Sequence, residues 1–231
     1  MKKYYYKLFL LCSFFNAVLN LCFGQPNFQH IESFTKKDGL PGNKVTDILP
    51  DDAGFLWITT NNGLVRYDGS EFHSFMPYSG EFYNLTNYMN RVISNGHNNL
   101  VISSFNGLFL FNTQKYTFRK IDFSGIRDSP LDSGFKPYLN MINFLEKDCN
   151  GNIWAGTQVS LYRLDSGLHL RKVFWSEYTR KDLYSKRLNY VFKILPLNKE
   201  ILLAWLDSKP YIWQKSEGNK GETFIPVENW E

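Results

Sequence analysis

Residues 148–157 read DCNGNIWAGT, and residues 51–60 read DDAGFLWITT. Each segment begins with Asp, has Gly at its fourth position and Trp at its seventh, and ends on Thr. Cys149 and Asn150 do not recur in the earlier segment, so the residues that recur are those that suit a turn and a packed strand. This recurrence predicts a repeated structural unit rather than a single reactive site.

The residues around the earlier segment predict four short antiparallel strands between positions 45 and 75. Apolar, aromatic and β-branched residues at 45–49, 55–60, 64–67 and 70–75 favour strands. The intervening DDAG, NNG and DG segments favour tight turns, because Asp, Asn and Gly hydrogen-bond locally or tolerate positive φ. Residues 45–75 are therefore interpreted as one four-stranded sheet.

The same succession of strands and turns returns three more times along the chain. Leu64 corresponds to Leu108, 44 residues later, and Leu108 corresponds to Leu161, after a further 53 residues. Repeats of about 40–50 residues with four strands each are typical of a β-propeller, because stacked blades cover both apolar faces of each sheet. The sequence predicts an all-β propeller with about four blades, at about 45–75, 89–121, 141–174 and 190–227. Unrelated hairpins in a β-sandwich are the alternative.

Residues 28–34 resemble a fourth strand that has no blade of its own. Propellers often close by lending such a strand to the last blade, which hides the sheet edges. The fourth repeat, however, has its own candidate strand at 223–227. Either 223–227 is not a strand and four blades close the ring, or further blades follow. We expect an incomplete ring, in a chain truncated from a larger propeller.

The N-terminus predicts export. Three Lys residues at 1–7 precede an apolar run at 8–24, and this order is typical of a secretory signal peptide, here residues 1–24. The run is shorter than the roughly 20 residues that a membrane span needs. An uncleaved anchor and a lipoprotein modified at Cys22 are the alternatives. No later apolar run of membrane length occurs in residues 25–231.

Removal of residues 1–24 changes both the charge and the cysteine content. Residues 25–231 carry 23 Lys and Arg against 22 Asp and Glu, a net charge of about +1, which gives no electrostatic reason to expect nucleic acid as a partner. Cys149 is the one cysteine left, so no internal disulfide framework is predicted.

The repeats resemble a known family. DDAGFLWITTNNGLVRYD (51–68) and DCNGNIWAGTQVSLYRLD (148–165) closely resemble the two-component regulator propeller repeat, and DGLPGNKVTDIL (38–49) is similar to the lead-in of its first blade. The resemblance covers about 28–215. Its second copy has Val101 in place of Trp, and its fourth copy loses most of the motif.

This resemblance implies the exported sensor region of a histidine kinase or hybrid two-component regulator. In that family such propellers usually form seven-bladed rings ahead of a membrane helix and a kinase, and many respond to polysaccharide fragments. The chain contains no kinase motif, so the resemblance implies a non-catalytic ligand sensor on the periplasmic or extracellular side of the cytoplasmic membrane. It further implies membrane attachment through later parts alone, and a homodimer in the full-length sensor.

The repeated motif residues are interpreted as structural. We expect the two Trp side chains to fill the space between blades, the two Asp side chains to bond to turn amides, and the Gly residues to adopt positive φ. These residues are Asp51, Gly54, Trp57, Gly63, Asp148, Gly151 and Trp154. A Ca²⁺ loop would need more oxygen ligands than D-x-N-G provides, so neither a metal nor a cofactor is predicted.

Catalytic motifs are absent from the sequence. The four His residues are scattered, and no HExxH, CxxC or GxSxG segment occurs. A propeller lyase or glycosidase is an alternative function, and a pair of inward-facing acids would distinguish it. A free secreted propeller that binds carbohydrate or protein is another alternative.

Ligand binding is predicted on the long loops between blades, where propellers commonly bind their ligands. The loop at 77–88 offers Tyr83 and Tyr88, and the loop at 175–188 offers Trp175, Tyr178 and Arg180. Aromatic planes combined with Arg suit an oligosaccharide. The alternative role of these side chains is to cover blade edges.

Overall fold

The computed structural model describes residues 32–77, 87–121, 141–157, 160–175, 193–198, 201–206, 209–215 and 222–227. The chain divides into two compact units, Met1–Phe34 and Thr35–Glu231. The predicted signal peptide lies outside the described residues. The fold below is that of the second unit.

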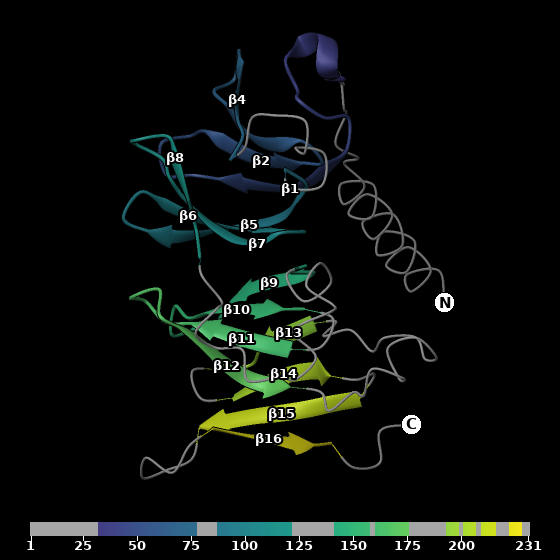
Figure 1. Ribbon diagram of the computed structural model, residues 1–231, viewed down its shortest axis with the longest axis vertical. Helices are drawn as coiled ribbons and strands as arrows, with labels where there is room; N and C mark the ends of the chain where they lie inside the picture. Colours follow the sequence, from purple (N-terminus) through teal and green to yellow (C-terminus); the bar gives the residue numbers. More distant parts are fainter. Residues whose placement is uncertain are drawn as a thin grey trace, which may run out of the picture. The chain divides into compact units, whose positions relative to one another are not determined.

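Within the described residues, four antiparallel sheets contain four strands each (Figure 1). The first two sheets are β1 (Val45–Pro50), β2 (Leu56–Thr60), β3 (Gly63–Tyr67), β4 (Phe72–Phe75), and β5 (Met89–Gly96), β6 (Asn99–Ser104), β7 (Gly107–Asn112), β8 (Thr117–Lys120). The last two are β9 (Phe144–Lys147), β10 (Ile153–Gly156), β11 (Ser160–Leu164), β12 (Leu170–Trp175), and β13 (Lys193–Pro196), β14 (Ile201–Leu206), β15 (Lys209–Lys215), β16 (Glu222–Pro226). Each strand pairs with its neighbours in sequence, which is the blade arrangement that the repeats predict.

A short lead-in precedes the first blade. The 3-10 helix η1 (Lys36–Asp38) is capped by Thr35, and Gly39 follows with φ 109°. Leu40 is buried against Ile58 and Val65 on one face of the first sheet. No helix in the described part of the chain has the length and apolar character needed to cross a bilayer.

Consecutive sheets meet through their first strands. β1 and β2 contact β5, β5 contacts β9, and β9 contacts β13. Among the described strands, no contact of comparable extent joins the first sheet to the fourth. The first strands therefore lie innermost, as in a propeller, and the described blades form an incomplete ring, as expected.

The predicted closing strand at 28–34 is not formed at Glu32–Phe34, and its remaining residues lie outside the described part. The fourth sheet explains why no lent strand is needed. β16 pairs with β15 along its length, with Ile212 opposite Ile225. The outer place in this sheet is already filled by the chain that follows β15.

Large side chains fill the space between sheets. Trp57 packs between the first and second sheets, and its ring lies 5.5 Å from that of Phe111 in an edge arrangement. Trp154 packs between the third and fourth sheets, with its ring 5.2 Å from that of Trp213. Val101 takes the equivalent place between the second and third sheets. The seventh residue of the repeated motif thus packs between its own blade and the next.

One carboxylate holds each long turn of the motif. Asp51 accepts hydrogen bonds from the amides of Ala53 and Phe55, both at 3.0 Å, and from Trp57 Nε1 at 2.8 Å. Asp148 accepts the same set from the amides of Asn150 and Asn152 and from Trp154 Nε1. The amide bonds were expected from the sequence, but the bond to the indole was not. Gly54 and Gly151 adopt positive φ in these turns.

A second carboxylate turn joins the third and fourth strands. Asp68 accepts bonds from the amides of Ser70 and Glu71, and Asn112 stands at the equivalent position in the second sheet. The Glu71 amide, followed by the amide and hydroxyl of Ser70, holds the pKa of Asp68 well below its usual range. The amide of His169 likewise lowers the pKa of Asp165 in the third sheet.

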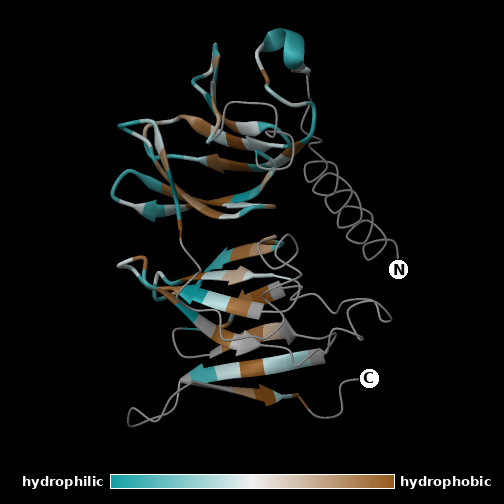
Figure 2. Ribbon diagram, viewed as in Figure 1, coloured by the Kyte–Doolittle hydropathy of each residue, from teal (hydrophilic) through white to brown (hydrophobic). Residues whose placement is uncertain are grey.

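Alternate side chains of the fourth sheet form an apolar row that no other described sheet covers. Leu195, Leu203, Ile212 and Ile225 lie directly opposite one another across β13–β16. Leu195 is 46% exposed and Ile225 is 44% exposed. Figure 2 shows that strands of all four sheets carry such hydrophobic segments, coloured brown. In the earlier sheets the equivalent row, which contains Trp57 or Trp154, packs against the next blade.

The Asp51 turn provides a stability test. We expect Asp51→Ala to lower the free energy of unfolding by about 2–3 kcal/mol, because three donors lose one acceptor. Asp52→Ala is the matched control: Asp52 is exposed in the same turn, and we expect a change within about 0.5 kcal/mol. Urea denaturation followed by Trp fluorescence measures both. Equal effects of the two substitutions would contradict the proposed role of Asp51.

The lowered pKa of Asp68 predicts a dependence of stability on pH. Below about pH 4 the unfolded carboxyl takes up a proton that the folded one does not, so stability falls as the pH decreases. Asp68→Asn keeps an acceptor oxygen, as Asn112 does, and removes this proton uptake. We expect its unfolding free energy to fall less steeply between about pH 4 and pH 2.5. Urea denaturation at a series of pH values measures this dependence. If the unfolding free energies of the original chain and of Asp68→Asn fall with equal slopes, the Asp68 carboxylate does not contribute to the pH dependence of stability.

Candidate functional site

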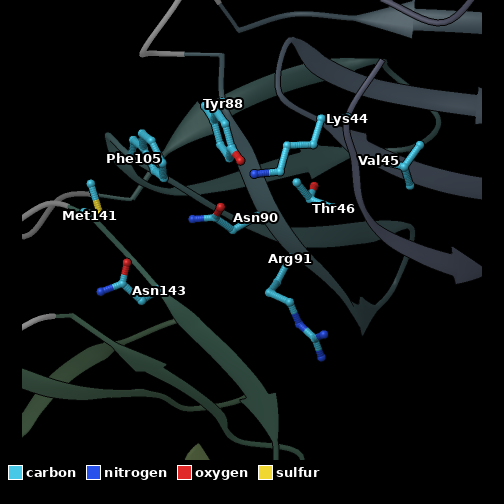
Figure 3. Close-up of a pocket in the computed structure, with 9 residues that line it drawn as sticks. All are labelled: Lys44, Val45, Thr46, Tyr88, Asn90, Arg91, Phe105, Met141 and Asn143. Atoms are coloured by element: carbon cyan, nitrogen blue, oxygen red, sulfur yellow. The ribbon is translucent and has the colours of Figure 1, made fainter. Parts of the chain in front are cut away.

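The innermost strands begin around a depression of about 610 Å³ (Figure 3). Its wall combines residues of three blades: the starts of β1 and β5, the segment before β9, and the turn between β6 and β7. The lining residues are Lys44, Val45, Thr46, Tyr88, Asn90, Arg91, Phe105, Met141 and Asn143. Loops and strand ends near a propeller axis are the common place for a ligand.

An aromatic pair forms one wall. The rings of Tyr88 and Phe105 are stacked, with centroids 4.2 Å apart and planes 7° from parallel. The Phe105 amide donates to the Tyr88 carbonyl at 3.3 Å. Ser104 fixes the turn that carries Phe105, since its hydroxyl accepts from the Asn106 amide and donates to the Gly107 carbonyl. The pair is therefore held in place by backbone and turn contacts before any ligand binds.

Lys44 extends over this pair. Its ammonium lies 5.4 Å from the centroid of the Tyr88 ring, and Figure 3 shows the side chain reaching toward Tyr88. The Lys44 backbone is anchored, because its amide donates to Asn61 Oδ1 and its carbonyl accepts from the Asn61 amide. In the described part of the chain, Lys44 makes no ion pair with a carboxylate.

Three equivalent positions contribute polar side chains. Thr46, Asn90 and Asn143 are separated by the same 44 and 53 residues that separate the repeats. Thr46 Oγ1 donates to the Met89 carbonyl at 2.7 Å, and Asn90 Nδ2 donates to the Ile142 carbonyl at 3.0 Å. Asn143 Nδ2 is buried and has no hydrogen-bond partner among the described residues. The first two side chains thus tie each blade to the next, and the third is left with an unused donor.

The second cation of the depression is partly neutralised. Arg91 Nε lies 3.5 Å from Asp47 Oδ2, with 46% of the Arg91 side chain exposed. Asp47 Oδ2 also accepts from the Val92 amide at 3.0 Å, across the first and second sheets. Figure 3 shows the Arg91 guanidinium pointing away from the aromatic pair. Lys44 is therefore the cation nearer to that pair.

A second depression, of about 340 Å³, lies at the turns between the first two strands of the first and second sheets. Asp51 and His97 are among its lining residues. The oxygens of Asp51 are already occupied by its own turn and by Trp57. No group of three His, Cys, Asp or Glu side chains in the described residues is arranged to hold a metal. This depression is the weaker candidate for a site.

One of the five ligand residues predicted from the sequence lies in the depression of Figure 3, namely Tyr88. Trp175 is the last residue of β12. Tyr83, Tyr178 and Arg180 lie outside the described residues. Sequence reasoning missed Lys44, Asn90, Phe105 and Asn143. The alignment of the repeats could have indicated three of these residues. Asn90 and Asn143 occupy the same position in their repeats, and Phe105 begins the FNG turn that corresponds to NNG in the first repeat.

A family model described as the two component regulator propeller matches residues 39–62. The matched segment runs from Gly39 through β1 and the Asp51 turn and includes β2. No curated protein matches the chain by sequence. The match falls on the copy in which both the lead-in and the motif are preserved.

Solved structures are similar to this chain to different degrees. One is described as the extracellular domain of the hybrid two component system BT3049 from B. thetaiotaomicron: it is 18% identical, with a TM-score of 0.57 over 85% of this chain and 26% of that one. The extracellular domain of the hybrid two component system BT4673 from the same organism is 16% identical, with a TM-score of 0.42 over 83% of this chain and 29% of that one. A Streptogramin B lyase is 14% identical, with a TM-score of 0.49 over 82% of this chain and 57% of that one.

This chain spans about a quarter of the length of the BT3049 domain. At 18% identity that likeness shows the fold, a set of β-propeller blades. The family match agrees with the resemblance seen in the sequence: residues 39–62 are similar to the two-component regulator propeller repeat.

Proposed function

We propose that this chain is part of the exported, ligand-sensing region of a two-component signal transduction system, with no catalytic activity of its own. The observation that carries the proposal is the match of residues 39–62 to the two component regulator propeller. The structural likeness to an extracellular domain of a hybrid two component system is consistent with it. The predicted signal peptide at 1–24 would place these blades outside the cytoplasmic membrane.

The proposed ligand site is the depression at the starts of the innermost strands. Tyr88 and Phe105 offer an aromatic surface, and the amide groups of Asn90 and Asn143 lie in the same wall. Flat aromatic surfaces beside a few polar groups suit an oligosaccharide, whose rings have apolar faces and polar edges. A glycan fragment is therefore the proposed class of ligand.

The position of the site suggests how binding could be reported. Its lining comes from the first three blades, which are joined in part by side-chain hydrogen bonds such as that from Thr46 to the Met89 carbonyl. A ligand that contacts all three blades favours the arrangement in which its contacts are complete, and so shifts the population of blade arrangements. A membrane-linked kinase could read that shift through a dimer of the full-length sensor.

A glycosidase is disfavoured at this site. Glycosidases use two carboxyl groups about 5–10 Å apart. The described lining contains no Asp or Glu, and the nearby Asp47 is engaged by Arg91 and the Val92 amide. A free secreted binding propeller would use the same site. The genomic sequence downstream distinguishes this alternative from the sensor, because an in-frame membrane helix and kinase would support the sensor.

Oligosaccharide binding tests the proposal. Isothermal titration of the purified chain against a panel of oligosaccharides should identify a ligand, and Phe105→Ala should weaken its affinity about tenfold, because ring stacking is lost. Tyr67→Ala is the matched control: Tyr67 belongs to another stacked pair, with Phe72, outside the depression. We expect its affinity to be unchanged.

Two results would contradict the proposal. If none of the oligosaccharides in the panel binds the chain, the result argues against a glycan sensor. Equal losses of affinity in the Tyr67 and Phe105 variants would argue that binding depends on general stability and not on this site.

A further inference from the structure

We infer that the depression at the starts of β1, β5 and β9 takes an anionic ligand, with a carboxylate or sulfate group placed beside Lys44. This rests on the proposed function and narrows its ligand class to acidic sugars. The starting observation is the balance of charge. The described lining contains two cations, Lys44 and Arg91, and no Asp or Glu.

Lys44 is the residue that gives the site a preference for an anionic ligand. Arg91 is already 3.5 Å from Asp47, so part of its charge is neutralised. Lys44 makes no ion pair in the described part of the chain, and its backbone is fixed on both sides by Asn61. Its ammonium lies over the Tyr88 ring, at the edge of the aromatic wall. An anion bound there gains a charge-assisted contact without displacing a carboxylate of any described residue.

The neighbouring amide supplies a second reason. Asn143 lines the depression, and its Nδ2 is buried without an acceptor in the described part of the chain. A buried donor that lacks a partner is unfavourable, so a rotation that turns this amide toward a bound oxygen would be favourable. The equivalent donor, Asn90 Nδ2, is committed to the Ile142 carbonyl. Lys44, and Asn143 once its amide is turned toward the depression, therefore donate hydrogen bonds to a carboxylate or sulfate. The Tyr88 and Phe105 rings suit the body of a sugar.

The probes should differ by one charge per sugar unit. We would titrate the full chain with an oligogalacturonate and with its methyl ester, which has the same rings but neutral carboxyl groups. The acid is expected to bind at least about tenfold more tightly at low ionic strength, with the difference shrinking as salt is added. Inorganic sulfate forms a third arm: binding of sulfate alone with the same dependence on Lys44 would assign recognition to the anion itself, independent of the sugar.

Variants locate the effect. Lys44→Gln should remove the preference for the acid over the ester, whereas Lys44→Arg should keep it. Lys37→Gln is the matched control, because Lys37 is an exposed lysine on η1 outside the depression, and it should leave the preference unchanged. Thermal unfolding of each variant checks that the fold is intact. Asn143→Ala should weaken both probes, with the larger loss for the acid.

The outcomes separate this inference from the proposed function. Equal affinity for acid and ester, with Phe105 still required, would overturn the anionic ligand and leave the glycan sensor standing. Acid binding by Lys44→Gln at the level of the unchanged chain would also overturn it. A complete absence of binding to the oligosaccharide panel would overturn both.

Discussion

A single Asp carboxylate in the first turn of a blade fixes both the turn and the wedge against the next blade. In the first repeat one oxygen of Asp51 receives two turn amides, and the other receives the indole N–H of Trp57. The indole is buried between sheets, where an unpaired N–H would be unfavourable. The carboxylate therefore allows a Trp to serve as an apolar filler. The third repeat uses the same arrangement, with Asp148 and Trp154.

The second repeat shows what happens when this interaction is absent. Val101 replaces the Trp, and Asn95 stands at the Asp position. Its strands are joined by a two-residue turn, in which His97 and Asn98 both have positive φ, at 51° and 59°. Two consecutive positive φ values are typical of the type I′ hairpin. The Asp, the long turn and the Trp are thus all replaced in this repeat, which is consistent with their acting as a unit.

The fold could be predicted from the sequence because its information is local and repeated. Turn residues and alternating strands recur at fixed spacing, and each copy supports the others. The site could not be predicted in the same way, because it combines residues from three blades. Tyr88 was predicted as an aromatic ligand residue on a loop, whereas Lys44 and Asn143 line the proposed site only because the first strands of adjacent blades meet. Residues that are remote in sequence gain a shared role only once the stacking of sheets is known.

The same stacking rule bears on the fourth sheet. Three rows that contain Trp57, Val101 and Trp154 are each covered by the following blade. The row of the fourth sheet is apolar throughout, yet Leu195 and Ile225 at its ends remain about half exposed. Its outer strand position is filled by β16, so no strand borrowed from elsewhere would change this face. Among the described residues no neighbouring sheet covers this face, although burial of apolar surface is the main source of stability in such stacks. The requirement for a neighbour therefore follows from the side chains of β13–β16 themselves, independently of the family to which the repeats are similar.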